Sequence, residues 1–76
     1  MTFDAHVAMI HRVDDVWVCE WQGNKLVLTS KEIDIHPKEL CYEAADNMDI
    51  SLISEIIVFH EGKPSFTFNG DTWKWL

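Results

Sequence analysis

The order of apolar and polar positions predicts a β-rich chain with a helix near its middle. Residues 16–29 read VWVCEWQGNKLVLT, in which β-branched and aromatic residues flank Gln22-Gly23-Asn24, a tripeptide that favours a tight reversal. We therefore predict an antiparallel hairpin there. Residues 5–13 alternate in the same way and lead through two aspartates into the hairpin, so the first three strands should form a meander.

A helix is predicted over residues 37–48. Pro37 suits the first helical position and Asn47 is a C-terminal signal. At about 100° per residue, the apolar side chains fall on one arc and the acidic side chains on the other. The apolar arc consists of Leu40, Cys41, Ala44, Ala45 and Met48, and the acidic arc of Glu39, Glu43 and Asp46. The apolar arc should lie on a sheet and the acidic arc should face water.

The last part of the chain returns to a β pattern. Residues 52–60 hold a continuous apolar run, which is expected of a strand covered on both sides. Residues 65–68 form a short strand, and Asn69-Gly70-Asp71 is a strong hairpin turn before residues 72–76. The pattern predicts an α+β fold. Its antiparallel β-sheet has five to six strands in the order β-β-β-α-β-β, with an optional sixth strand, and one helix packs on one face.

The predicted helix is too short for the predicted sheet. Twelve helical residues span roughly 18 Å, which is less than the width of five or six strands. Several strands nevertheless carry apolar residues on both faces, and aromatic residues are frequent near the C-terminus. Some apolar surface must therefore curl on itself, pair with a second copy, or meet a partner.

Length and composition indicate one folded domain over residues 1–76. The chain is 47% hydrophobic with four tryptophans, which argues against disorder. It has no run of about 20 apolar residues that could cross a membrane, and its first residues lack the layout of a signal peptide. We expect a cytoplasmic protein, in which Cys19 and Cys41 are buried, reduced thiols.

The net charge of −7 is concentrated in one segment. Residues 32–61 contain eight acids and one base, whereas the remainder contains five acids and five bases. A helix tuned only for stability would mix lysines among its acids, because Glu39 and Glu43 repel each other four residues apart. The clustering favours a negative surface that docks on a basic partner. The alternative is a solvated helix face that keeps a small protein in solution.

The candidate partner-binding residues combine this acidic segment with the terminal aromatic residues. Tryptophan is enriched in binding hot spots, and a tryptophan near a chain end serves a partner or dimer contact as readily as a core. Aromatic rings could stack on bases, but only six lysines and arginines are present to neutralise phosphates, so we expect no direct nucleic-acid binding. The candidates are Asp34, Glu39, Glu43, Asp46, Asp49, Trp73 and Trp75.

Neither a cofactor nor a catalytic site is expected. The histidines and cysteines lack the paired short spacings of zinc sites, and the chain has no glycine-rich phosphate loop and no HExxH motif. Cys19 lies between two tryptophans and Cys41 on the apolar helix arc, so neither has the exposed, electropositive setting of a nucleophile.

We therefore expect a small acidic, non-catalytic protein that binds a basic protein surface. If that surface normally binds nucleic acid, the protein would act as a nucleic-acid-mimicking inhibitor of the kind found in phages and mobile elements, an analogy of size and charge only. The alternative is a homodimeric interaction domain built through the aromatic sheet face or the terminal strand. An enzyme or a metal protein is the least favoured class.

Overall fold

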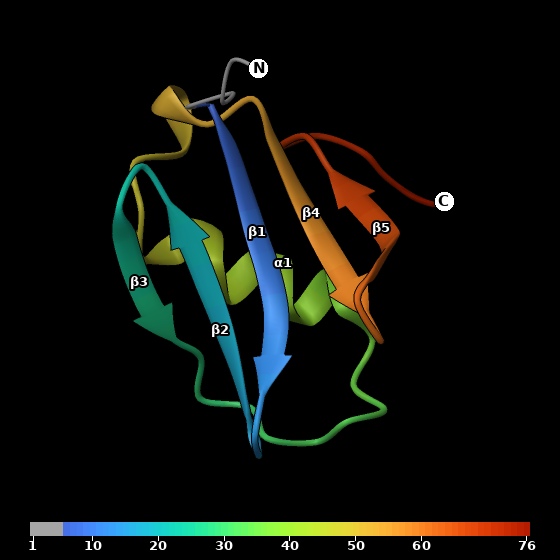
Figure 1. Cartoon of the computed structure of the whole chain (residues 1–76). Coiled ribbons are helices and arrows are strands. Elements are labelled where there is room, and N and C mark those ends of the chain that lie inside the picture. Colours follow the sequence, from blue (N-terminus) through green and yellow to red (C-terminus); the bar gives the residue numbers. More distant parts are fainter. Residues whose placement is uncertain (1–5) are drawn as a thin grey trace.

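The computed structural model describes residues 6–76 of the chain. The first three strands form the predicted meander, a helix follows, and three further strands complete the chain (Figure 1). The elements are β1 (Val7–Val13), β2 (Val16–Trp21), β3 (Asn24–Val27), α1 (Pro37–Asp46), the 3₁₀-helix η1 (Ile50–Leu52), β4 (Glu55–His60), β5 (Lys63–Phe68) and β6 (Trp73–Trp75). The α+β class is confirmed, and β6 is the sixth strand that the sequence left optional.

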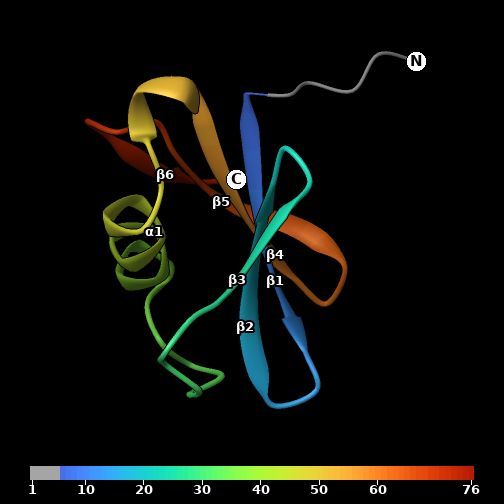
Figure 2. The ribbon, with the colours of Figure 1, turned by 90° about the vertical axis from the view of Figure 1, so that its left-hand side faces the viewer.

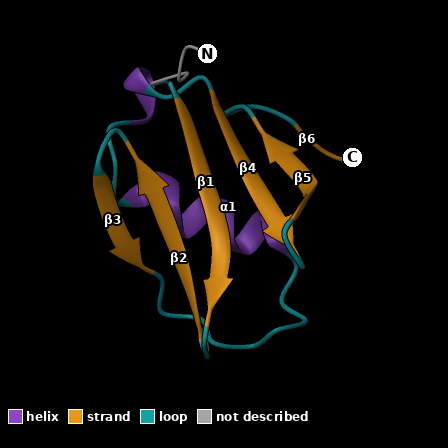
Figure 3. Ribbon diagram, viewed as in Figure 1, coloured by secondary structure: helices purple, strands orange, loops and turns teal. Residues whose placement is uncertain are grey.

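The strands of residues 6–76 form one six-stranded sheet in the order β3-β2-β1-β4-β5-β6. The prediction of a purely antiparallel sheet is wrong, because β1 and β4 are parallel neighbours, with Val7 opposite Glu55 and Ile10 opposite Val58. The connection through α1 is the physical reason. It carries the chain from the end of β3 back to the starting edge of β1, so β4 runs in the direction of β1 (Figures 1 and 3).

Two-residue turns close the β2–β3 and β4–β5 hairpins. Gln22 and Gly23 have positive φ angles of 47° and 79°, and Glu61 and Gly62 have φ angles of 51° and 79°. Positive φ at both central residues is typical of type I′ turns, whose twist matches that of paired strands. These turns set the registers in which Trp21 lies opposite Asn24 and His60 opposite Lys63.

The core lies between α1 and one face of the sheet, as Figure 2 shows in side view. The predicted apolar arc is confirmed at Leu40, Cys41 and Ala44, which are buried against Ile10, Cys19, Ile56 and Phe66 from the central strands. The helix begins at Pro37 after an N-cap at His36 and ends at Asp46 with Asn47 as its C-cap. Met48, expected in the helix, lies beyond it and packs against the core.

The opposite face of the sheet has no covering element within residues 6–76. Ile56 and Val58 point into the core, but their neighbours Ile57 and Phe59 are only half-buried on the far side. The expected cover on both sides of this apolar run is therefore not found in the described residues. No helix in this part of the chain is long and apolar enough to cross a membrane.

Leu40→Ala should lower the free energy of unfolding by about 2–5 kcal/mol, because the side chain is 1% exposed and its removal leaves a cavity under α1. The matched variant Leu52→Ala removes the same atoms from a side chain that is 54% exposed, and should change stability by less than about 0.5 kcal/mol. Urea unfolding followed by tryptophan fluorescence measures both. Equal losses would contradict the placement of the core.

Candidate functional site

The outward side of α1 presents the three predicted carboxylates, and we call Glu39, Glu43 and Asp46 the acidic flank. Glu39 and Asp46 are exposed. Within residues 6–76, neither carboxylate makes a hydrogen bond or an ion pair. Among the described residues, the contacts between carboxylates and basic side chains lie elsewhere: Glu20 contacts Lys25 and His11, and Glu61 contacts His60. The negative charge of the acidic flank is therefore not neutralised by the protein's own bases.

Glu43 differs from the other two because its carboxylate accepts hydrogen bonds from another residue of the protein. The backbone N–H of Thr29 donates to Oε2 at 2.7 Å, and the Thr29 hydroxyl donates to Oε1 at 2.9 Å. Hydrogen bonds to a charged acceptor are stronger than those between neutral groups. Glu43 thus connects α1 to the segment that follows β3. It also contributes negative charge to the acidic flank, although each of its carboxylate oxygens already accepts a hydrogen bond.

Asp34 and Asp49 lie on either side of α1 along the chain and not on it. Asp34 is exposed in the turn before the helix. Asp49 follows the helix, and its Oδ1 accepts hydrogen bonds from the Ser51 N–H at 3.1 Å and the Ser51 hydroxyl at 2.6 Å. The five predicted acids therefore all belong to α1 and its two flanking turns.

Trp73 and Trp75 belong to an aromatic cluster with His36 and Phe66. The His36 ring meets Phe66, Trp73 and Trp75 edge-on at centroid distances of 5.8, 5.3 and 5.3 Å, and Trp73 stacks on Phe66 at 5.4 Å. Phe66 is buried, whereas Trp73 and Trp75 are 41% and 56% exposed. The two tryptophans therefore rest on a fixed aromatic base and still present large surfaces to solvent.

His36 is a residue whose role the sequence reading missed. Its Nδ1 accepts a hydrogen bond from the Lys38 backbone N–H at 3.1 Å, which caps the first turn of α1. The same ring fills the space between α1 and β6. The His-Pro pair directly before the helical pattern is the signal in the sequence that could have indicated this role.

Tyr42 joins the acidic flank to β5, the strand that pairs with β6 and its two tryptophans. It is 45% exposed, and its ring packs edge-on against Phe68 of β5 at 5.6 Å. Tyr42 is three residues after Glu39 and four residues before Asp46. At this spacing its side chain lies beside both carboxylates on the helix surface. Lys38 lies on the same side, with its Nζ 6.0 Å from the Trp73 ring centroid. The exposed acids and rings thus form one surface, which we call the docking surface.

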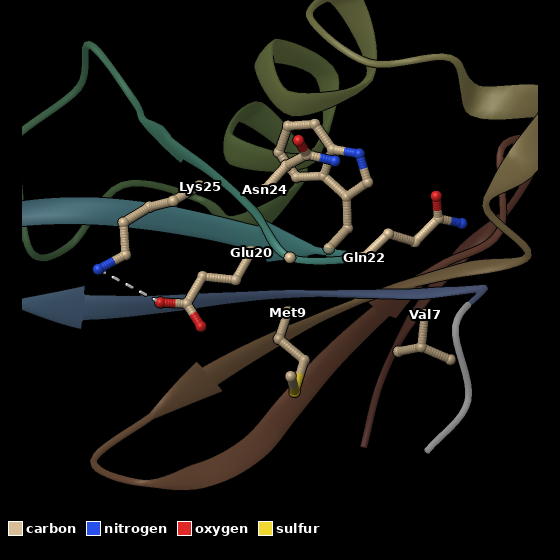
Figure 4. Close-up of a pocket in the computed structure, with 8 residues that line it drawn as sticks. Val7, Met9, Glu20, Gln22, Asn24 and Lys25 are labelled. Carbon is tan, nitrogen blue, oxygen red and sulfur yellow. Dashed lines mark ion pairs between the residues drawn. The ribbon is translucent and has the colours of Figure 1, made fainter. Parts of the chain in front are cut away.

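A separate hollow of about 300 Å³ lies on the far side of the sheet. Figure 4 shows Val7, Met9 and Glu20 projecting from that side, with the Glu20 carboxylate 3.7 Å from the Lys25 ammonium. Its other lining residues belong to the β2–β3 turn. This hollow holds none of the residues predicted from the sequence.

The two cysteines are free and buried in the core. Burial raises the pKa of the Cys19 thiol to about 12, and the negative charge of Glu20 adds to the effect. Burial also raises the pKa of Cys41 to about 12, with a smaller contribution from Cys19. Protonated, inaccessible thiols are poor nucleophiles. In the described part of the chain, no group of three or more His, Cys, Asp or Glu side chains is placed to hold a metal ion.

Comparison with known proteins gives no identification, because no family model, curated protein or solved structure matches the chain.

Native protein should resist alkylation by iodoacetamide at pH 8 and react fully once unfolded in urea, because both thiols are 0% exposed. Each folded pKa lies above the ordinary value of 9.0. The stability due to the protonated thiols should thus be complete below pH 9 and fall as the pH rises toward 12. Mass spectrometry counts the labels, and urea unfolding at several pH values tests the trend. Rapid labelling of the folded protein would contradict this placement.

Glu43→Ala should lower the free energy of unfolding by about 1–2 kcal/mol, because it removes both hydrogen bonds to Thr29 and leaves the Thr29 N–H without its acceptor. Glu39→Ala, the same change one turn earlier, should have an effect near zero. Thermal unfolding of the two variants side by side provides the measurement. Similar losses in both would mean that Glu43 has no special structural role.

Proposed function

We propose that this protein is a non-catalytic protein-binding protein that docks the outward side of α1 on a basic surface of its partner. The observation that supports the proposal is the exposed, unneutralised charge of Glu39 and Asp46 beside half-exposed rings. A negative patch steers a positively charged partner during encounter and opposes the approach of acidic proteins. The proposal includes a cytoplasmic site of action, an expectation that comes from the sequence alone.

The aromatic part of the docking surface favours arginine as the partner's contact residue. A guanidinium can stack on an indole or phenol ring and at the same time bind a carboxylate through two hydrogen bonds. Tyr42 offers a ring directly beside Glu39 and Asp46, and Trp75 offers a second ring that is 56% exposed. Lysine can supply charge but not the planar stacking, so an arginine-rich surface is the better chemical match.

The more specific form of the proposal is a nucleic-acid-mimicking inhibitor of phage or mobile-element type. Surfaces that bind nucleic acid are rich in arginine and lysine, and a protein with clustered carboxylates can occupy such a surface in place of phosphates. Asp34 and Asp49 extend the negative surface beyond both ends of α1. This form rests on charge and size and makes the partner a nucleic-acid-binding protein.

The double variant Glu39→Lys with Asp46→Lys should weaken binding of the partner by about tenfold or more, because two attractive charges become repulsive. The partner is first captured from host lysate at low salt and identified by mass spectrometry. Its affinity is then measured by calorimetry at low and high salt. Wild-type binding should weaken steeply as salt is added, because exposed charges are screened.

The matched control is Asp15→Lys with Asp71→Lys, which changes the net charge by the same amount at exposed residues that do not belong to α1. This variant should keep most of the wild-type affinity. Equal losses in the two double variants would show that net charge, and not the docking surface, drives binding. The mimic form additionally requires that the protein displace bound DNA or RNA from the partner, and a complex that keeps its nucleic acid would contradict it.

A further inference from the structure

The side of the sheet opposite α1, which we call the open face, is more apolar than a solvated sheet face should be. A sheet with one wet face normally alternates apolar and polar side chains along each strand. In β1, however, Val7 and Met9 point to the open face while Ala8 and Ile10 fill the core. Ile57 and Phe59 of β4 continue the apolar surface, since Met9 lies directly opposite Ile57 in the parallel pair.

The apolar surface continues towards one edge of the sheet only. On β2, Val18 lies opposite His11 of β1 and is only 4% exposed, whereas Val27 of β3, the next residue across, is 56% exposed. On β5, Thr67 pairs with Ile57, is 7% exposed, and donates its hydroxyl hydrogen bond to Glu55. The apolar part of the open face is therefore centred on the β1–β4 pair and reaches solvent most fully at Val27.

The open face also differs from the rest of the molecule in its charge. It carries the acids Glu20 and Glu55, and the bases Lys25 and Lys74 lie on the same face according to the strand registers. Glu20 is paired with Lys25 at 3.7 Å and with His11 at 3.4 Å. Two copies of a protein with a net charge of −7 repel each other, and the open face is a large surface on which acids and bases balance.

Size and shape suit a second copy. The whole molecule measures 29 × 26 × 24 Å, so one face projects to at most about 750 Å² (29 × 26); a standard interface buries roughly 800 Å² per partner, and a dimer of that size would therefore use nearly all of the open face. Two hollows, of about 300 and 280 Å³, flank Met9 on this face. Side chains projecting from a second copy can enter such hollows and add the packing contacts that a flat sheet lacks.

We infer that the open face is the interface of a symmetric homodimer. The two sheets pack face to face around Met9, Ile57 and Phe59 of both copies, in the manner of a sheet sandwich. The helices and docking surfaces then lie on the two outer sides of the dimer. The dimer would present two acidic surfaces that point in opposite directions, and it could bind two basic partners at once.

The test is the mass of the protein in solution, measured by light scattering after gel filtration. Wild type should have twice the monomer mass of 8.9 kDa. Met9→Lys and Ile57→Lys should each be monomeric, because they place unpaired charge in the apolar interface. The matched control Tyr42→Lys makes the same kind of change at a 45% exposed side chain on the α1 side and should stay dimeric. Circular dichroism checks that each variant is folded.

Salt separates this inference from the proposed function. The dimer should persist or tighten in high salt, because salt screens the repulsion between two acidic copies and does not weaken apolar contacts. Binding of the basic partner should weaken in the same buffer. A wild-type protein that is monomeric at millimolar concentration in both low and high salt would overturn the homodimer and leave the docking surface unaffected.

Two further outcomes also decide the question. A dimer that survives Met9→Lys and Ile57→Lys but is lost in Tyr42→Lys would place the interface on the α1 side and contradict the inference. If both lysine variants fail to fold, the methyl resonance of Met9 in wild-type protein replaces them. Its chemical shift should change with protein concentration, whereas a resonance that stays constant up to millimolar concentration would refute the dimer.

Discussion

In the part of the chain that the structure describes, the sheet is covered by a helix on one face only, and this inequality decides where the core and the exposed apolar groups lie. In residues 6–76, α1 packs on one face of a six-stranded sheet, and no second layer of helix follows. The side chains beneath α1 form the core, and Phe66 is fully buried there while Trp73 and Trp75 remain at its margin. Because a domain of 76 residues buries only about 60% of its unfolded surface, a small core of this kind leaves apolar groups exposed at its edges and on the far face.

The same arrangement leaves part of the charge of α1 fully in water. Glu39 and Asp46 lie on the side of the helix that faces away from the sheet, so their carboxylates reach water without being desolvated. Glu43 shows that the segment also has a structural role, since its bond to Thr29 holds the helix against the end of β3. The helix α1 therefore contributes both to the stability of the fold and to the charge of the surface. Its individual acids do not contribute equally to these two roles.

Local patterns predicted the elements well because they depend on neighbours in sequence. Alternation and turn residues located β2, β3 and the β5–β6 turn, and the spacing of Leu40, Cys41 and Ala44 identified the buried side of α1. The parallel pairing of β1 with β4 escaped prediction because it depends on where the crossover returns the chain. Contacts such as His36 with Trp75 and Tyr42 with Phe68 join residues far apart in sequence, so their part in the candidate site became visible only in three dimensions.

The register of β1 against β4 also has a consequence for how the chain reaches its native state. The β1–β2–β3 meander and the β4–β5–β6 meander each pair neighbouring segments, which need only short loops to close. Val7 and Glu55, by contrast, are 48 positions apart (55 − 7), and joining them costs more chain entropy before any contact repays it. We expect the two meanders to form early and their junction to be the slow event, during which the unpaired edges of β1 and β4 are exposed to other chains.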